Sequence, residues 1–311
     1  MVHDAPAWPS LGLNLPYTEG GMDGATPRWA DIAAMATAAE DAGFDAVWVS
    51  DHVGFGDPDA GWGGAWESWT LLSALAVATS RVRLGTYVTA VPYRNPALLA
   101  KMAETLDEVS GGRVILGLGA GWNQPEFDAY GFPWERRFDR FEDGLRIITS
   151  MLRTGRADLE GRVVAARGAL IQPRGPRPGG LPVMVGAAAP RMLRLCAELA
   201  DEWNAGMRTP AALRPMLAAL DDACAAAGRD PRSIRRSAEA LVEIGAAAGP
   251  DDDADQRGSW DDPLRGTAEE IAAGLRRYRD LGVGHVQIQL RPNGVASVAA
   301  FAPVIEALRA G

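Results

Sequence analysis

Residues 113–119, RVILGLG, form a nearly continuous apolar run that ends in glycine, and such a run predicts a strand buried on both faces of a parallel sheet. A helix is predicted before it, because Asn95-Pro96 joins a helix-capping residue to a proline in the first turn and the helical pattern continues to about Val109. Val82 to Val88 (VRLGTYV) predicts the preceding strand. Strand, helix and strand in this order make one βαβ unit.

The same alternation continues outward to both ends of the chain. Further strands are predicted at Leu11–Pro16, Phe44–Ser50, Val183–Gly186, Glu202–Ala205, Ile234–Ile244 and His285–Leu290. Further helices are predicted from Thr26-Pro27 to Gly43, and over Glu67–Thr79, Glu135–Arg153, Pro190–Leu199, Ala211–Ala227, Thr267–Leu281 and Ala296–Arg309. Eight βα units predict an α/β fold of the (β/α)8 TIM-barrel type, in a single domain over residues 1–311. An open, doubly wound sheet is the alternative architecture.

One segment falls outside this alternation. Glu160 to Pro182, after the fourth βα unit, is rich in glycine, arginine and proline. We therefore expect a short hairpin and a linker there, as an insertion into the barrel.

The composition limits the class of partner. The 311 residues carry a formal net charge of −9, which argues against a nucleic acid or an acidic membrane surface. Met1–Ser10 lacks a basic-then-apolar signal segment and no apolar run approaches ~20 residues, so we expect a cytoplasmic protein. Cys196 and Cys224 fall in helical patterns and are expected to be buried, and the absence of a Cys/His cluster predicts no metal site.

His52 is the candidate catalytic residue. In a barrel of this kind the active site lies at the C-terminal ends of the strands, and His52 directly follows the second strand. The other two histidines are less well placed, because His3 lies near the start of the chain and His285 begins a strand. An imidazole can exchange protons near neutral pH. The alternative is that His52 caps or packs.

Two small-residue segments are candidate cofactor contacts. Gly117 to Gly121 (GLGAG) is not a dinucleotide fingerprint, because the third glycine of that motif would fall at Trp122. We interpret it as backbone that a flat ring approaches closely, with a tight turn as the alternative. Gly186 to Arg191 (GAAAPR) exposes the start of a helix, where amide groups bind phosphate, although any small loop could have this composition.

The loop Val53 to Trp66 carries Phe55, Trp62 and Trp66 among many glycines. A loop at this end of a barrel can be a lid or a substrate wall. A surface loop without a function explains the glycines but not the three aromatic residues.

Taken together, five stretches resemble the bacterial-luciferase-like family of flavin and deazaflavin oxidoreductases. They are Ala38–His52 (AAEDAGFDAVWVSDH), Leu84–Lys101 (LGTYVTAVPYRNPALLAK), Leu106–Trp122 (LDEVSGGRVILGLGAGW), Leu181–Pro190 (LPVMVGAAAP) and Ala200–Asn204 (ADEWN).

The resemblance implies a barrel, usually a homodimer, that holds coenzyme F420 or, alternatively, FMN. The ring would lie over strands two to four, with His52 exchanging a proton and Asp51 bonding the polar edge of the ring. A bulge with a non-proline cis bond at Tyr87–Val88 would support the ring. The full set of expected cofactor contacts is Asp51, Thr86, Tyr87, Val88, Gly119, Ala120, Gly121, and, for the phosphate, Gly186, Ala187, Ala188, Ala189 and Arg191.

The chain departs from the family at informative positions. Trp122 stands where the deazaflavin-dependent sugar-phosphate dehydrogenases carry a catalytic glutamate. Those enzymes also hold the substrate phosphate with lysines, whereas Lys101 lies in a predicted helix, away from the strand ends. That activity is therefore not expected. Ala188 and Ala189 stand where two glycines are common. The leading hypothesis is an F420-dependent oxidoreductase that transfers a hydride between the deazaflavin C5 and a small organic substrate. The alternatives are an FMN-dependent monooxygenase that uses O2 and a non-catalytic flavin-binding or structural paralogue.

Overall fold

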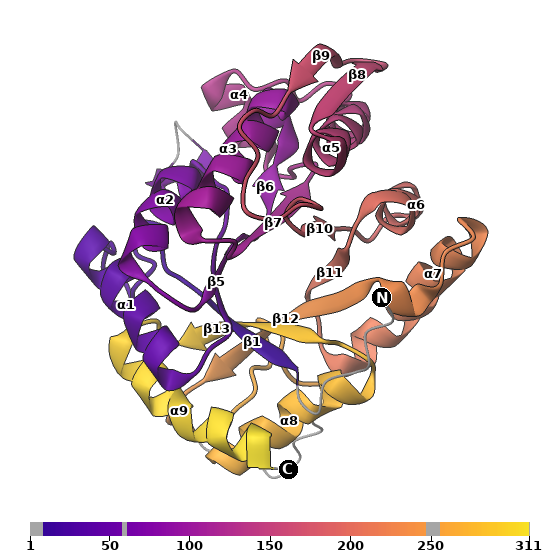
Figure 1. Ribbon diagram of the computed structural model, residues 1–311. Coiled ribbons are helices and arrows are strands. Elements are labelled where there is room, and N and C mark those ends of the chain that lie inside the picture. The colour runs from indigo at the N-terminus through magenta and orange to yellow at the C-terminus, as the bar shows by residue number, and fades with distance from the viewer. Residues whose placement is uncertain (1–8, 58–60, 247–255, 311) are drawn as a thin grey trace. The chain divides into compact units, whose positions relative to one another are not determined.

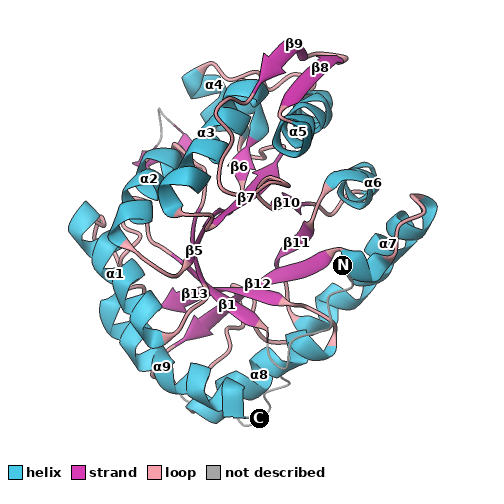
Figure 2. Ribbon diagram, in the orientation of Figure 1, coloured by secondary structure: helices cyan, strands magenta, loops and turns pink. Residues whose placement is uncertain are grey.

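The parallel strands form the predicted barrel. The computed structural model describes residues 9–57, 61–246 and 256–310. Its parallel strands follow the hydrogen-bonded order β10-β11-β12-β13-β1-β2-β5-β7, and β7 pairs in turn with β10, which is the closed eight-strand topology of a (β/α)8 barrel. The predicted fold class is therefore confirmed, and the open sheet is excluded. The alternation of helices and strands is visible in Figure 2.

The chain divides into two compact units, and each is described by itself. The first comprises the described residues of 1–16, 20–48 and 186–311. Its strands are β1 (Ser10–Asn14), most of β2 (Ala46–Val49), β11 (Glu202–Met207), β12 (Arg235–Glu243) and β13 (His285–Arg291). Its helices are α1 (Trp29–Ala42), α6 (Pro190–Leu199), α7 (Pro210–Ala226), the 3-10 turn η2 (Pro231–Ser233), α8 (Ala268–Asp280) and α9 (Val295–Ala310). Helix α9 packs between α1 and α8 (Figure 1).

The second unit comprises residues 17–19 and the described part of 49–185. Its strands are β3 (Gly54–Asp57), β4 (Gly61–Gly64), β5 (Arg83–Thr86), β6 (Thr89–Ala90), β7 (Val114–Gly119), β8 (Arg156–Glu160), β9 (Ala165–Leu170) and most of β10 (Val183–Gly186). Its helices are α2 (Ser68–Ala78), the 3-10 turn η1 (Val91–Tyr93), α3 (Pro96–Ser110), α4 (Gln124–Tyr130) and α5 (Arg137–Thr154). That residues 1–311 are one folding domain stays a prediction.

Two predicted helix starts are confirmed by their caps. The side chain of Asn95 accepts hydrogen bonds from the backbone amides of Ala97 and Leu98 at 3.0 and 3.1 Å. Thr267 and Glu270 form a reciprocal capping box at the start of α8, with the Thr267 amide donating to the Glu270 carboxylate at 2.7 Å.

The predicted start of the first helix is wrong. Thr26 does not cap it, and the helix begins at Trp29. The physical reason is that Asp31, inside the first turn, accepts a hydrogen bond from the Arg28 amide at 2.8 Å and so makes Arg28 the capping position. Helix α4 was not predicted; it has seven residues and is capped by Gly131 in the left-handed conformation.

Both irregular segments are hairpins. The insertion after the fourth βα unit is the antiparallel pair β8–β9, which packs on α5. It begins at Arg156 rather than Glu160, because α5 ends at Thr154, Gly155 caps it, and the chain enters the strand at once. In the loop Val53–Trp66, β3 pairs with β4. Residues 58–60 of that loop, and His3, lie outside the described residues, and whether the loop moves stays a prediction.

His285 holds the start of β13 in the buried core. Its side chain is fully buried, its Nε2 accepts a hydrogen bond from the indole of Trp48 at 3.1 Å, and its Nδ1 lies 2.6 Å from the Ser10 hydroxyl. A Cβ atom on Gly12 would lie 2.2 Å from the Trp48 indole nitrogen, so only glycine fits against this pair. His285 is therefore engaged in packing, which leaves His52 as the histidine of interest.

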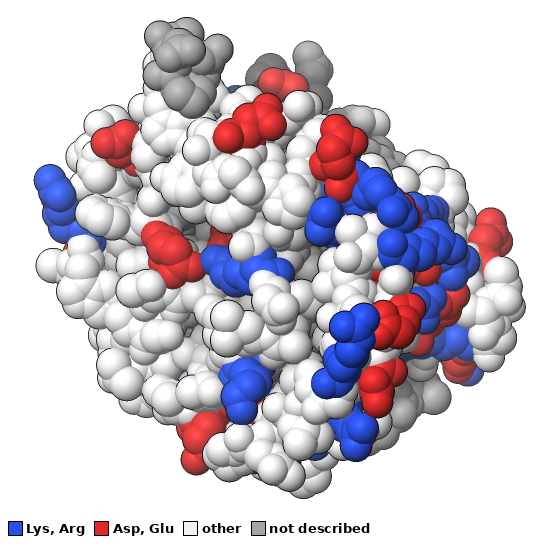
Figure 3. All heavy atoms as spheres, turned by 90° about the horizontal axis from the view of Figure 1, so that it is seen from above, with Lys and Arg blue, Asp and Glu red and all other residues white. Residues whose placement is uncertain are grey.

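The cysteines, the membrane and metal expectations and the surface charge can be compared with the structure directly. Cys196 and Cys224 are both buried, as expected, and neither is in a disulfide. Burial raises the pKa of the Cys196 thiol. Among the described residues, none of the helices has the length and apolarity to span a bilayer, and no group of three or more potential metal ligands occurs. On the face shown in Figure 3, basic and acidic side chains are interspersed.

Candidate functional site

His52 pairs with a buried carboxylate that was not predicted from the sequence. Its Nδ1 lies 2.7 Å from Oε2 of Glu126, whose side chain is fully buried, while the His52 side chain is 17% exposed. Because an ionised carboxylate can only accept, the proton of a neutral imidazole is on Nδ1. Nε2 then carries a lone pair.

Glu126 is itself held by four donors. Besides His52, the backbone amides of Val53 and Gly54 donate to Oε1 at 2.7 and 3.1 Å, and the Tyr93 hydroxyl donates to Oε2 at 3.1 Å. Burial acts to raise the pKa of Glu126, but the bonds from His52 and the two amides outweigh it and leave the pKa below the ordinary value of 4.5. Burial and the charge of Glu126 raise the pKa of Tyr93, so the tyrosine remains a donor.

Local structure explains why these groups meet. The chain leaves β2 at Val49 and turns into β3 at Gly54, so His52 and the two donating amides are on one short turn. Glu126 lies in α4, which is tied to the same turn by a second bond, from the side-chain amide of Asn123 to the carbonyl of Gly54 at 3.2 Å. The turn and the short helix therefore fix the orientation of the imidazole together.

Asp51 is fully engaged within the protein. Arg94 donates to both of its oxygens, at 2.6 and 2.9 Å, and the Ser68 hydroxyl and Ala90 amide donate at 2.6 and 3.0 Å. Arg94 also pairs with Glu67 at 2.7 Å. Asp51 thus joins the end of β2 to α2 and η1. That it also bonds the edge of a cofactor ring stays a prediction.

Two aromatic rings lie against His52. The Phe55 ring centroid is 4.4 Å from that of the imidazole, and the Trp122 centroid is 5.6 Å away in an edge-on arrangement. Of the three aromatic residues predicted to form a wall in this loop, the structure brings Phe55 to His52. Trp62 instead stacks with Tyr130 of α4 at 6.4 Å.

The cis bond expected on the third barrel strand is present. The Tyr87–Val88 peptide bond is cis, as the family resemblance implied. The Thr86 hydroxyl is used internally, since it donates to the carbonyl of Gly117 and accepts from its amide. The buried hydroxyl of Thr89, by contrast, has no hydrogen-bond partner among the described residues.

The glycines at the end of β7 have reasons within the protein. A Cβ on Gly119 would lie 2.6 Å from Cγ2 of Val88. Gly121 has φ +76°, and a Cβ there would lie 2.6 Å from the Phe127 ring, so a side chain would be both strained and crowded. Ala120 between them is buried. Tight packing accounts for these glycines without a ligand, and contact with a cofactor ring stays a prediction.

The candidate phosphate loop belongs to the first unit. Gly186 ends β10, and the loop Ala187–Ala189 is pinned at Ala187, whose carbonyl accepts from the Trp203 indole at 2.8 Å and whose amide donates to Asn204 at 3.2 Å. Ala188 and Ala189 are exposed, Ala189 caps α6 without a side-chain bond, and the first turn of α6 contains Arg191 and no acidic residue. Such a helix start attracts an anion.

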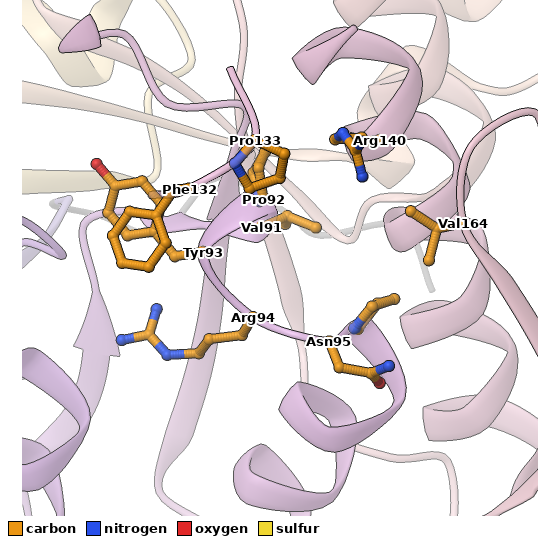
Figure 4. Close-up of a pocket in the computed structure, with 10 residues that line it drawn as sticks. Val91, Pro92, Tyr93, Arg94, Asn95, Phe132, Pro133, Arg140 and Val164 are labelled. Carbon is orange, nitrogen blue, oxygen red and sulfur yellow. The ribbon is translucent and has the colours of Figure 1, made fainter. Parts of the chain in front are cut away.

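A cavity of about 300 Å³ lies beside Tyr93 (Figure 4). Its walls are the segment Val91–Pro96 together with Phe132, Pro133, Arg140 and Val164. The Arg94 guanidinium is directed to Asp51 and Glu67, and neither His52 nor Glu126 lines the cavity. The cavity is therefore not the space around the imidazole.

Glu126, Tyr93 and Arg94 are the site residues that sequence reasoning missed. The sequence does contain a signal for Glu126, because Pro125 just after a glycine-rich strand end is typical of a first helical turn. A carboxylate on that turn, at the active-site end of the barrel, is a candidate partner for His52.

Comparison with known proteins places the chain in a family. The chain is 34% identical over 163 residues to 5,10-methylenetetrahydromethanopterin reductase of Archaeoglobus fulgidus, which covers 52% of this chain and 45% of the relative. It is 32% identical over 180 residues to pyrimidine monooxygenase RutA of an Enterobacter species, covering 55% and 48%. These alignments thus span about half the length of each relative.

The fold matches a solved structure across nearly all of the chain. The coenzyme F420-dependent tetrahydromethanopterin reductase of Methanopyrus kandleri superposes with a TM-score of 0.77 and 20% identity, covering 96% of this chain and 99% of that one. The model of the luciferase-like monooxygenase family matches residues 10–256. As its sequence motifs predicted, the chain belongs to the luciferase-like monooxygenase family.

Proposed function

We propose that the chain is an F420-dependent oxidoreductase that moves a hydride between the cofactor and a small organic substrate, with His52 exchanging the proton. The observation that carries the proposal is the His52–Glu126 pair, because it holds an imidazole with one nitrogen available at the end of a barrel strand. The reductase relative and the F420-dependent structural neighbour support the choice of cofactor.

The residues present fit such a cofactor. The start of α6, with exposed alanines, no side-chain cap and no acidic residue, suits a phosphate group. In the other unit, the buried Thr89 hydroxyl beside the Tyr87–Val88 cis bond has no partner among the described residues, and it suits a polar edge of a ring. The ring would be held by Asp51, Thr86, Tyr87, Val88, Gly119, Ala120 and Gly121, and the phosphate by Gly186, Ala187, Ala188, Ala189 and Arg191.

Side chains of the protein then carry the proton. When bound, the deazaflavin supplies or accepts the hydride at its C5. His52 accepts the hydroxyl proton of an alcohol at Nε2 during oxidation, and returns it to the carbonyl oxygen during reduction. Glu126 stabilises the imidazolium that forms, and Tyr93 with the amides of Val53 and Gly54 keeps Glu126 in place.

A titration with F420 and FMN on the same preparation tests the proposal. We expect F420 to bind at least about tenfold more tightly, which corresponds to about 1.4 kcal/mol. Equal or reversed affinities would instead favour an FMN-dependent monooxygenase, the activity class that the similarity to RutA suggests. Binding of neither cofactor would leave the non-catalytic paralogue as the better description.

A further inference from the structure

The surface beside His52 is aromatic and open. The Trp122 side chain belongs to a residue that is 68% exposed, yet its ring contacts both His52 and Phe55, with centroids 5.6 and 6.4 Å away. A single exposed aromatic residue is ordinary. Here the exposed Trp122 and the half-buried Phe55 lie together beside a reactive imidazole, and aromatic surface in that place suits a ligand contact.

The hairpin β3–β4 presents Phe55 to this surface. Successive residues of a strand point to opposite faces, so Gly54 and Gly56 lie on the face opposite to Phe55. On that opposite face the Trp62 indole crosses over Gly54, where a Cβ would lie 2.3 Å from the ring, and stacks with Tyr130 of α4. Trp62 thus packs on one face of the hairpin, and Phe55 on the other face lies against His52.

The charged groups of this cluster are already paired. Glu126 is fully buried and accepts four hydrogen bonds. Asp51 is engaged by Arg94, and Arg94 is shared between Asp51 and Glu67. Within the described part of this cluster, no charged side chain is left to balance a phosphate or carboxylate on a substrate, and burying an unpaired charge there is costly.

From these observations we infer that the substrate is an uncharged, flat aromatic or conjugated alcohol, or the corresponding carbonyl compound, that stacks on Trp122 and Phe55 with its oxygen at Nε2 of His52. This inference rests on the proposed function and specifies its substrate class. In the oxidative direction the alcohol carbon loses a hydride to the deazaflavin, and the hydroxyl proton goes to His52. The products are the carbonyl compound and the reduced cofactor.

Binding of matched ketones to the F420-loaded protein tests the inference, with calorimetry as the readout. The probes are 2-acetylnaphthalene, the same molecule bearing a carboxylate on the distal ring, and its fully saturated decalin analogue. We expect 2-acetylnaphthalene to bind about tenfold or more tightly than the carboxylate and several-fold more tightly than the saturated analogue.

Three variants locate the binding surface. Trp122→Ala and Phe55→Leu should each weaken 2-acetylnaphthalene about fivefold, the range of one aromatic contact. Trp260→Ala is the matched control, because Trp260 is 59% exposed and makes no ring contact in the described structure. Melting curves of Trp122→Ala should match the wild type, since the residue is largely exposed.

The outcomes separate this inference from the proposed function. Equal binding of the carboxylate probe, or unchanged binding in Trp122→Ala, would overturn the aromatic substrate class even if F420 binds. Failure of F420 to bind, measured by its own absorbance on the same samples, would count against the proposed function instead. Loss of binding in Trp260→Ala as well would also overturn the assignment to this surface.

Discussion

At the scale of single residues, the site depends on one hydrogen bond between His52 and Glu126. The two residues are 74 positions apart in the chain, so no local pattern pairs them. The histidine was predictable because the end of a strand places it, whereas its partner depends on where α4 lies. Helix α4 was not predicted, since seven residues carry too little periodicity to indicate a helix.

Replacing His52 by alanine tests its role as the proton carrier. We expect turnover of any accepted alcohol or ketone to fall by ~10²–10⁴-fold, because the substrate proton loses its acceptor. Affinity for F420 should change much less, since other groups are expected to hold the ring and the tail. Retained turnover in a folded, cofactor-loaded variant would remove His52 from the mechanism.

Replacing Glu126 by glutamine should change which ring nitrogen of His52 carries the proton. In the wild type we expect the neutral His52 ring to carry its proton on Nδ1, because the carboxylate can only accept. In Glu126→Gln the side-chain oxygen should stay with the two backbone amides that donate to Oε1, so the NH2 group faces Nδ1. The neutral ring should then change from the Nδ1-protonated to the Nε2-protonated tautomer. Nitrogen-15 NMR distinguishes them, and the chain has only three histidines to assign. A wild-type ring protonated on Nε2 would contradict the proposed geometry.

At the scale of elements, predicted bounds were correct where a glycine or proline stands at the end of a helix or strand. Strand β10 and helix α6 have the bounds that the sequence predicted, because Pro182 and Gly186 mark the ends of the strand and Pro190 marks the start of the helix. The start of α1 was wrong because its cap comes from Asp31 inside the helix rather than from the residues before it. When a residue inside the helix makes the capping bond, the sequence at the helix start contains no typical capping residue.

The ion pair between Asp51 and Arg94 is expected to contribute strongly to the stability of the fold around the site. The Asp51 side chain is 2% exposed, and removing one partner of a buried pair leaves the other charge uncompensated. We expect Asp51→Asn to lower the free energy of unfolding by about 3–5 kcal/mol in urea titrations. Glu160→Gln, which breaks the fully exposed pair with Arg167 on β8–β9, is the control and should change stability little. Similar effects of the two substitutions would refute the structural role of Asp51.

At the scale of the whole molecule, the fold was the most predictable property. Eight alternating units leave few architectures open, and each apolar strand needed only to be recognised as buried. The pairing of distant side chains was not predictable in the same way. It depends on the exact turn between β2 and β3, which carries the two amides that fix Glu126.

The state of association is a further prediction at this scale. Family resemblance leads us to expect a homodimer, so light scattering at micromolar concentration should give about twice the 32.9 kDa of one chain. A mass of one chain under these conditions would refute the dimer. Dilution over a hundredfold range would separate a stable dimer from a weak one.

The bond between Trp203 and the carbonyl of Ala187 has a consequence for engineering. The indole is completely buried, and it holds the loop before α6 from a neighbouring strand. Laboratory evolution toward another cofactor tail would therefore enrich changes at 203 and 204 alongside changes in the loop. Such changes reshape the loop from beneath, and a library restricted to surface-facing alanines would omit them.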